Sequence, residues 1–254
     1  MSKCEFCTEF SRDGSIASTL FTVLFPKREH RVLFESPNFV IVPSLGQIVE
    51  GYLLIITKEH YPSMGHLPPQ LYAELLWTIE RTCDILRTQY GCSCVQFEHG
   101  PVNSRQRGPC CIDHAHLHLV PMDLDLVSTE LQLARTSTAD DYPKNASEYI
   151  QAGLPYLYVK AQNGGTHSAI LMDASDLPSQ YMRRILANAA GKPHEWDWAL
   201  SVGTQELESC LDTLGPEFAK LEILHAEKCL WEPVCAPRVQ MELTARCAES
   251  FERS

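Results

Sequence analysis

The stretch Cys111-Ile112-Asp113-His114-Ala115-His116-Leu117-His118-Leu119-Val120-Pro121 decides the interpretation of this sequence. Its three histidines stand at alternate positions, and alternate side chains of a β-strand point to the same face. We therefore expect three imidazoles on one surface, with the apolar residues between them buried behind it. Imidazole can act near neutral pH as a nucleophile, a general acid–base or a metal ligand. Chance placement is the alternative, but 10 histidines in 254 residues would rarely alternate in this way.

The sequence around this stretch is typical of an α+β meander. Short apolar runs bounded by Gly, Pro and Asn predict strands, and a longer run with helical spacing that follows Pro68-Pro69 and ends at Gly91 predicts a helix. The resulting fold class is α+β, an antiparallel sheet with a packed helix. In chain order, the expected elements are a hairpin over 31–42, a strand over 52–56, a helix over 68–91, a strand over 94–97, a loop over 100–109 and a strand over 114–120.

After Met122 the pattern changes. Residues 123–150 are polar and weakly patterned, which predicts a linker or surface excursion. Two short apolar runs around Asn163-Gly164-Gly165 predict a second small sheet. Two helices are expected over 178–190 and 204–228, the latter divided at Gly215-Pro216. We therefore expect two domains, one over 1–122 and a C-terminal extension over 123–254 that is mixed and then mainly helical.

Composition limits the possible partners. The formal net charge is −11, which argues against nucleic-acid binding through a basic surface but permits a small phosphorylated substrate. No apolar stretch is long enough to span a bilayer, so no membrane partner is expected. The N-terminus has no apolar signal core, and the 11 cysteines read as thiols or metal ligands. These features favour the cytoplasm, or the nucleus.

Three motifs in the first half resemble those of the histidine triad (HIT) family. Residues 114–118 match its His-x-His-x-His motif. The segment from Gly51 to His60 is similar to its Gly-His-x-Leu-Val-Ile-Pro-Lys-x-His segment. Cys4-Glu5-Phe6-Cys7 resembles the Cys-x-x-Cys at the start of zinc-containing members. The resemblance covers about residues 1–122, roughly half of the chain, and implies a HIT-like fold there.

The resemblance implies a phosphorus-centred activity. His116 would attack the α-phosphorus of a nucleotide and form a covalent nucleotidyl-histidine, which water or another acceptor resolves. His118 would contact the phosphoryl oxygens and the leaving-group side. Some branches of the family carry Gln at that place, so His118 places this chain nearer the hydrolases. The expected enzyme is a nucleotide hydrolase or nucleotidyltransferase that cleaves a phosphoanhydride, phosphoramidate or phosphoester.

The resemblance also implies a structural zinc ion. Two thiolates and two imidazoles suit a closed tetrahedral site, and the chemistry at His116 needs no catalytic metal or organic cofactor. The implied ligands, Cys4, Cys7, His60 and His114, come from three segments that are distant in the sequence.

Several residues depart from the family pattern. Tyr52 replaces a histidine that supports the catalytic histidine in many members. Ser44 stands where many members have an Asp that binds the ribose hydroxyls, and Cys111 stands where they have a Ser or Thr that donates to phosphate. Asn103 is in the place of a phosphate-contacting amide, unless an inserted loop puts Glu98 there. Ser44, Asn103 and Cys111 remain candidate substrate contacts.

Further candidate substrate contacts lie in the long loop and in the extension. Arg105 and Arg107 could grip a phosphate or carboxylate as planar forks, or could be ordinary solvated charges. Gln180, Arg183 or Arg184 could bind the leaving group at the start of a helix that closes the pocket, or this helix could simply pack its face on the first domain. His99 could face the pocket or lie on the surface.

Two other classes of function stay open. The chain could be a repurposed triad enzyme that acts on a non-nucleotide small molecule, which Tyr52, Ser44 and the large extension would motivate. It could also be a non-catalytic nucleotide-binding protein, although an intact triad argues against that. The sequence leaves the base, the leaving group, the choice between hydrolase and transferase, the pathway and the oligomeric state open, with a homodimer as one possibility.

Overall fold

The computed structural model describes residues 4–10, 19–103, 112–125, 136–138, 141–163 and 166–228. The chain forms two compact units, Met1–Phe218 and Ala219–Ser254. The sheet and the histidine cluster belong to the first unit. Of the second unit, the structure describes the helical residues 219–228, which end the last helix.

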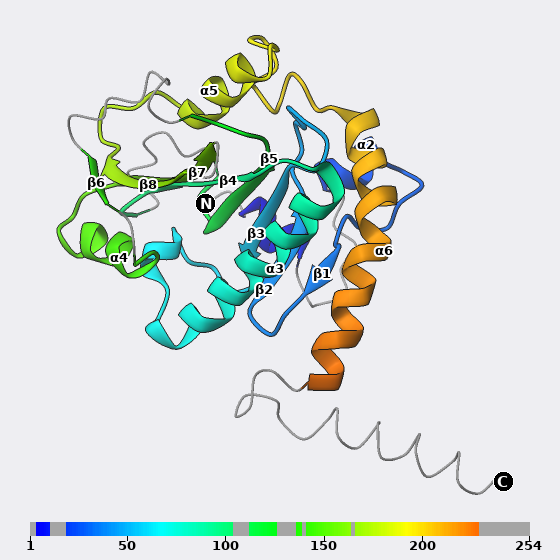
Figure 1. Ribbon diagram of the computed structural model, residues 1–254, viewed down its shortest axis with the longest axis horizontal. Coiled ribbons are helices and arrows are strands. Elements are labelled where there is room, and N and C mark those ends of the chain that lie inside the picture. Colours follow the sequence, from blue (N-terminus) through cyan, green and yellow to red (C-terminus); the bar gives the residue numbers. More distant parts are fainter. Residues whose placement is uncertain are drawn as a thin grey trace, which may run out of the picture. The chain divides into compact units, whose positions relative to one another are not determined.

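One antiparallel sheet organises the first unit. Within the described residues it has eight strands in the order β1-β2-β3-β5-β4-β7-β8-β6. Figure 1 shows β3, β5 and β4 side by side in its centre. The strands are β1 (Phe34–Glu35), β2 (Phe39–Pro43), β3 (Leu53–Thr57), β4 (Cys94–Gly100), β5 (His116–Pro121), β6 (Thr136–Thr138), β7 (Tyr156–Asn163) and β8 (Thr166–Asp173). The predicted α+β class with an antiparallel sheet is confirmed.

The sheet continues past residue 122. Strand β7 pairs with β4 in the register Phe97↔Val159, and β8 pairs with β7. The prediction of a second small sheet is therefore wrong. Strand β7 pairs with the open edge of β4 and satisfies the backbone hydrogen bonds there, and β8 follows on β7 in the same sheet. Two strands from the second half thus build part of the surface on which the histidines lie, and the division into domains at residue 122 stays a prediction.

Helix α3 (Tyr72–Tyr90) covers one face of the sheet. Two 3₁₀ turns, Met64–His66 and Pro69–Leu71, lead into it, and Gly91 ends it in the left-handed conformation, as the sequence predicted. Its buried side chains include Leu75, Ile79 and Leu86, whereas Leu76 is 48% exposed and lies outside this face.

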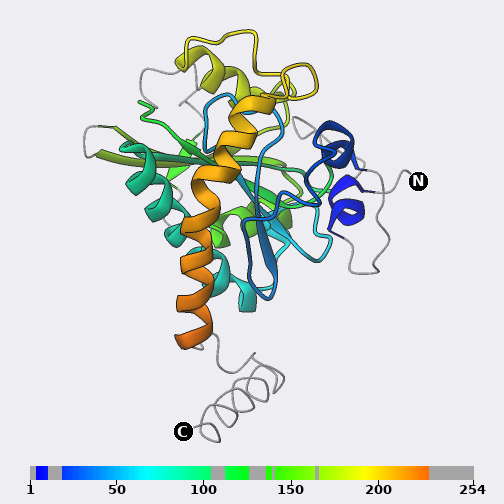
Figure 2. The same ribbon diagram turned by 90° about the vertical axis from the view of Figure 1, so that its right-hand side faces the viewer.

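Helix α5 (Tyr181–Ala189) covers the opposite face. Its buried residues Met182, Leu186 and Ala187 belong to the same apolar cluster as Phe97 of β4 and Val159 of β7. Figure 2 shows α5 and α3 on opposite sides of the sheet. The face that carries the triad is therefore covered by a helix from the second half of the chain.

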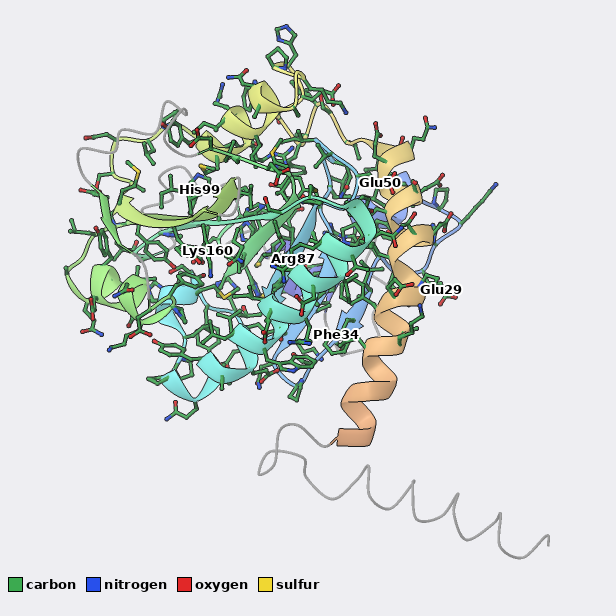
Figure 3. The ribbon with its side chains drawn as sticks, in the orientation of Figure 1. Glu29, Phe34, Glu50, Arg87, His99 and Lys160 are labelled. Carbon is green, nitrogen blue, oxygen red and sulfur yellow. The ribbon has the colours of Figure 1, made fainter. Side chains whose placement is uncertain are left out.

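The remaining helices are α1 (Glu5–Glu9), α2 (Leu20–Leu24), α4 (Lys144–Gln151) and α6 (Thr204–Lys228). The predicted break in α6 is wrong, since the helix runs through Pro216. Buried Leu214 and Phe218 flank this proline, and their packing outweighs the hydrogen bond that proline removes. Near the start of α6, Ser209 donates to Glu50 at 2.9 Å (Figure 3). Among the described residues, no helix has both the length and the apolar character needed to cross a bilayer.

A buried carboxyl group ties β4 to the segments around it on the α3 side of the sheet. Glu98 is 1% exposed and accepts hydrogen bonds from the Met64 amide at 2.7 Å, the Tyr142 hydroxyl at 3.0 Å and the Tyr156 hydroxyl. Burial raises the pKa of Glu98 from 4.5 to about 7. The three hydrogen bonds favour the ionised form and lower the pKa, but burial has the larger effect.

This network predicts a pH-dependent stability. Because the folded-state pKa of Glu98 is raised, its favourable contribution is present in full below about pH 4.5 and is lost as the pH rises to about 7. In Glu98→Gln this contribution is absent. We expect the free energy of unfolding of the wild type, measured relative to Glu98→Gln by urea titration, to fall by roughly 3 kcal/mol across that window. The control is Glu80→Gln, at an exposed position of α3. A pH-independent difference would contradict the assignment.

Candidate functional site

The triad strand β5 lies between β3 and β4. His116 is opposite Ile56 of β3, and His118 is opposite both Leu54 of β3 and Phe97 of β4. The rings of His118 and Phe97 stack at 4.2 Å and 3°. Antiparallel register thus gathers the alternate residues of three strands on one face, as the spacing of the histidines predicted.

A cavity of about 230 Å³ opens over this face, and His116 and His118 lie in its wall. The lining comes from both halves of the chain. The predicted contacts Ser44, Gln180 and Arg183 lie in its wall, together with residues that the sequence did not single out, namely Glu9, Arg31 and Trp198. A helix that follows the triad by more than 60 positions therefore closes the site.

A backbone hydrogen bond orients His116. Its Nδ1 lies 2.6 Å from the carbonyl oxygen of His114. A carbonyl can only accept, so Nδ1 carries the proton and Nε2 carries the lone pair. His116 is half-buried, and the edge of Phe6 lies against its ring at 5.5 Å. The imidazole is thus held in the tautomer that a nucleophile needs.

His118 has a side-chain partner. The Tyr52 hydroxyl lies 2.8 Å from its Nδ1, and both side chains are buried. The residue that departs from the family pattern at position 52 therefore contacts the third triad histidine. With the hydroxyl as donor, the Nδ1 of His118 accepts and its Nε2 carries the proton.

Burial keeps these imidazoles uncharged. It is the main cause that lowers the pKa of His116, against the bond to the His114 carbonyl, which raises it. It also lowers the pKa of His118, with the charges of His116, His99 and Arg183 as further causes. His99 lies in the same cavity, and burial followed by the charge of His116 lowers its pKa to about 3. Neutral imidazoles are good nucleophiles and hydrogen-bond partners at pH 7.

His114 points elsewhere. It precedes β5, and its Nδ1 lies 3.4 Å from the Cys4 sulfur and 3.5 Å from the Cys7 sulfur. The Nδ1 of His60 lies 3.3 Å from the Cys7 sulfur. The expectation that all three triad imidazoles line one surface therefore fails for His114, because two cysteines of the N-terminal segment draw its ring to another site.

The geometry of this cluster suits zinc. The four ligand atoms of Cys4, Cys7, His60 and His114 lie within 4.8 Å of one another. Bond lengths of tetrahedral zinc sites imply sulfur–nitrogen separations of about 3.6 Å, close to the three observed. His114 also bonds through Nε2 to the Thr57 carbonyl oxygen at 2.7 Å, an outer contact typical of metal-bound histidine. A zinc ion there would join α1, the segment after β3 and the triad strand.

Not all of the predicted contacts meet at the cavity. Asn103 is exposed and does not belong to the lining, so its role stays a prediction. Glu98, the alternative phosphate contact, points to the opposite face because strand alternation puts it there, while His99 faces the cavity. Figure 3 marks His99 on β4. Arg105, Arg107 and Cys111 lie outside the described residues.

Some lining residues had a signal in the sequence, and others had none. His99 stands two positions from Phe97, so alternation along β4 could have placed it on the triad face. Arg31, Glu9 and Trp198 had no comparable signal, since their positions depend on contacts between segments far apart. Arg31, for example, pairs with Glu9 through two hydrogen bonds of 2.7 and 2.8 Å.

Comparisons with known proteins find similarities to solved structures over part of the chain. No protein-family model and no curated protein matches the chain. Solved structures do resemble it, all at low identity. A hypothetical histidine triad nucleotide-binding protein from Sulfolobus tokodaii is 18% identical, with a TM-score of 0.32, over 40% of this chain and 66% of that chain. A HIT family protein from Bacillus anthracis is 16% identical, with a TM-score of 0.33, over 42% of this chain and 75% of that chain. A zinc-bound histidine triad family protein from Mycobacterium smegmatis is 17% identical, with a TM-score of 0.32, over 52% of this chain and 88% of that chain.

The cluster predicts one zinc ion per chain. Replacing Cys7 by Ser removes a thiolate ligand, and we expect metal content to fall and the Tm to drop by roughly 10 °C, since metal binding and folding are coupled. Elemental analysis and thermal unfolding check this, and Cys92→Ser, outside the cluster, is the control. Equal metal content in the two variants would argue against the site.

Proposed function

We propose that this chain is a histidine triad enzyme that transfers or hydrolyses a nucleoside monophosphate group through His116. The observation that carries the proposal is the 2.6 Å hydrogen bond from His116 Nδ1 to the His114 carbonyl. It leaves Nε2 as the nucleophilic atom of a neutral imidazole that lines a cavity.

The reaction would proceed in two displacements. In the first, Nε2 of His116 forms a bond to the α-phosphorus, and the bond from phosphorus to the leaving group breaks with its electron pair on the leaving atom. In the second, a water oxygen or another acceptor attacks the same phosphorus and releases His116. The His114 carbonyl accepts from the Nδ1 proton throughout and stabilises the positive charge that the ring gains in the intermediate.

His118 would serve the same phosphoryl group. With Nδ1 accepting from Tyr52, its Nε2–H can donate a hydrogen bond to a phosphoryl oxygen or to the leaving atom. Its ring centroid lies 4.8 Å from that of His116, so both imidazoles can reach one phosphate. Tyr52 would act as a positioning residue for His118, in place of the histidine that many members have.

Zinc would have a structural role. Held by Cys4, Cys7, His60 and His114, it would fix the backbone of His114, whose carbonyl orients His116. It would also hold α1, whose Phe6 packs against both histidine rings.

A second candidate is the same chemistry on a small phosphorylated compound that is not a nucleotide. The cavity of about 230 Å³ favours it, because pockets for drug-sized ligands usually measure about 300–1,000 Å³. Ser44 also favours it, since its hydroxyl donates to the adjacent Leu45 carbonyl at 2.9 Å, an interaction that competes with binding to a ribose.

The proposal predicts that His116→Ala abolishes nucleoside monophosphate release. The substrates are a dinucleoside polyphosphate, adenosine and guanosine phosphoramidates and a nucleotide sugar, with products separated by chromatography. Loss of the nucleophile should lower the rate at least about 100-fold, and a nucleotide adduct on the wild type, seen by mass spectrometry, should vanish.

The control is His30→Ala, at an exposed histidine outside the cavity. If the folded, zinc-loaded wild type releases no nucleotide from any of these substrates, the nucleotide reading is wrong. Release of phosphate or an adduct with a small phosphorylated compound would then favour the second candidate.

Tyr52→Phe tests the positioning of His118. The variant keeps the ring but loses the hydroxyl, so we expect kcat to fall by about tenfold or more with little change in KM, as when a buried hydrogen bond used in the transition state is removed. Steady-state kinetics measure this against Tyr72→Phe on α3. An unchanged kcat would show that His118 needs no partner.

A further inference from the structure

Two buried arginines line the cavity, and they differ in how their charge is balanced. Arg31 is 2% exposed and forms an ion pair with Glu9 at 2.7 Å. Arg183, on α5, is 4% exposed, and within the described part of the chain it forms no ion pair with a carboxylate. Among the described residues, the cavity wall therefore has one guanidinium paired with a carboxylate and one that has no such partner.

Arg183 is anchored by neutral groups. Its Nε donates to the Trp196 carbonyl at 2.7 Å and its Nη2 donates to the Gly46 carbonyl at 2.8 Å. Its guanidinium carbon also lies 5.3 Å from the centroid of the Tyr52 ring. Of the five N–H donors of a guanidinium, two serve these carbonyls and a third serves the Tyr52 hydroxyl, which leaves two without a protein partner among the described residues. These contacts fix the position of the guanidinium and leave some of its N–H groups available to a ligand.

A buried cation with unused donors is costly unless a counter-charge reaches it. The carbonyls and the ring of Tyr52 offset part of this cost through dipole and cation–π interactions. An anionic ligand group in the cavity would offset the rest, because a guanidinium can bind phosphate and carboxylate oxygens through two parallel hydrogen bonds.

The position of Arg183 is closely constrained. A Cβ at Gly46 would lie 2.6 Å from Cα and Cβ of Trp198 and 2.8 Å from Nη2 of Arg183, and Gly46 has φ +75°. Gln180, which precedes α5, has φ +57°, and its side-chain oxygen accepts from the Trp198 amide at 3.4 Å. A non-glycine residue in this conformation is strained, which the contact with Trp198 helps to hold. The backbone around Arg183 is thus packed into one arrangement.

Arg183 and His116 are connected by a chain of contacts that runs through Tyr52 and His118. His118 contacts His116 by its ring and Tyr52 by its Nδ1, and Arg183 lies over the Tyr52 ring. A phosphorus atom attacked by His116 would therefore leave room for a different part of the substrate at Arg183.

We propose that Arg183 forms a subsite for a second anionic group of the substrate, a phosphoryl or carboxylate group carried by the leaving group. This inference rests on the function proposed above and narrows the substrate to compounds with an acidic leaving group. In an anhydride, the broken P–O bond leaves its electron pair on the departing phosphate, whose added charge Arg183 stabilises. In a phosphoramidate of an amino acid, the P–N bond breaks with its electron pair on nitrogen, the amine takes its proton from water, and Arg183 holds the carboxylate.

Binding to a non-reacting variant tests the subsite. In the His116→Ala background, calorimetry measures the affinity of three probes that share one α-phosphate: adenosine phosphoramidate, its glycine derivative and adenosine diphosphate. We expect the glycine derivative or the diphosphate to bind at least about tenfold more tightly than adenosine phosphoramidate, whose leaving group is uncharged. Adenosine phosphoramidate is called the neutral probe below. The glycine derivative and the diphosphate separate a carboxylate from a phosphoryl preference.

Arg183→Met should remove this preference and leave the affinity for the neutral probe nearly unchanged. Arg183→Lys keeps the positive charge but loses the planar guanidinium, so it should retain part of the preference. This variant also tests the subsite if Arg183→Met does not fold. Arg184→Met, which removes a cation from the next position of α5 outside the cavity lining, is the matched control. Equal loss for all three probes would overturn the inference, because Arg183 would then serve the transferred phosphoryl group.

Inorganic phosphate separates the failure of this inference from that of the proposed function. Suppose that no nucleotide probe binds, but that phosphate raises the Tm of the wild type and of Arg184→Met and not that of Arg183→Met. This result would support the anion subsite and contradict the proposal of a nucleotide substrate. If phosphate stabilises all three equally and no acidic probe is preferred, the subsite is refuted.

Discussion

The hydrogen bond between His116 Nδ1 and the His114 carbonyl is the interaction on which the site depends. It sets the tautomer of the central imidazole, and it does so through a backbone atom of a residue whose side chain belongs to the cysteine–histidine cluster. His114 thus links the cysteine–histidine cluster to the imidazole of His116. Because the carbonyl can only accept, this arrangement holds the Nε2 lone pair free without a second side chain.

The sheet register extends this constraint to the other residues of the site. Antiparallel pairing puts His118 beside Phe97 of β4 and Leu54 of β3, so the face that carries His116 and His118 has an apolar floor. That floor lowers the pKa of the imidazoles through burial and strengthens each polar contact above it. Tyr52 adds a polar contact to His118, and Arg183 adds a guanidinium to the cavity wall.

The second half of the chain completes the cavity over the triad face. Strand β7 extends the sheet beyond β4, and α5 covers the triad side of it. The helix brings Arg183 over Tyr52, and the segment that follows brings Trp198 against Gly46. The substrate subsite proposed at Arg183 therefore exists only where the two halves meet, and the leaving-group preference would be a property of the extension.

Local pattern in the sequence determined the strands around the triad and helix α3 with its glycine end, because alternation and helical spacing are short-range features. It also placed His116 and His118 on one face, whereas the ligand set of the cysteine–histidine cluster was implied by the family resemblance. Tertiary structure alone decided that β7 joins the first sheet, and that Arg31 pairs with a carboxylate while, among the described residues, Arg183 does not. These outcomes depend on contacts between residues far apart in the sequence, whose packing and charge balance no local pattern encodes.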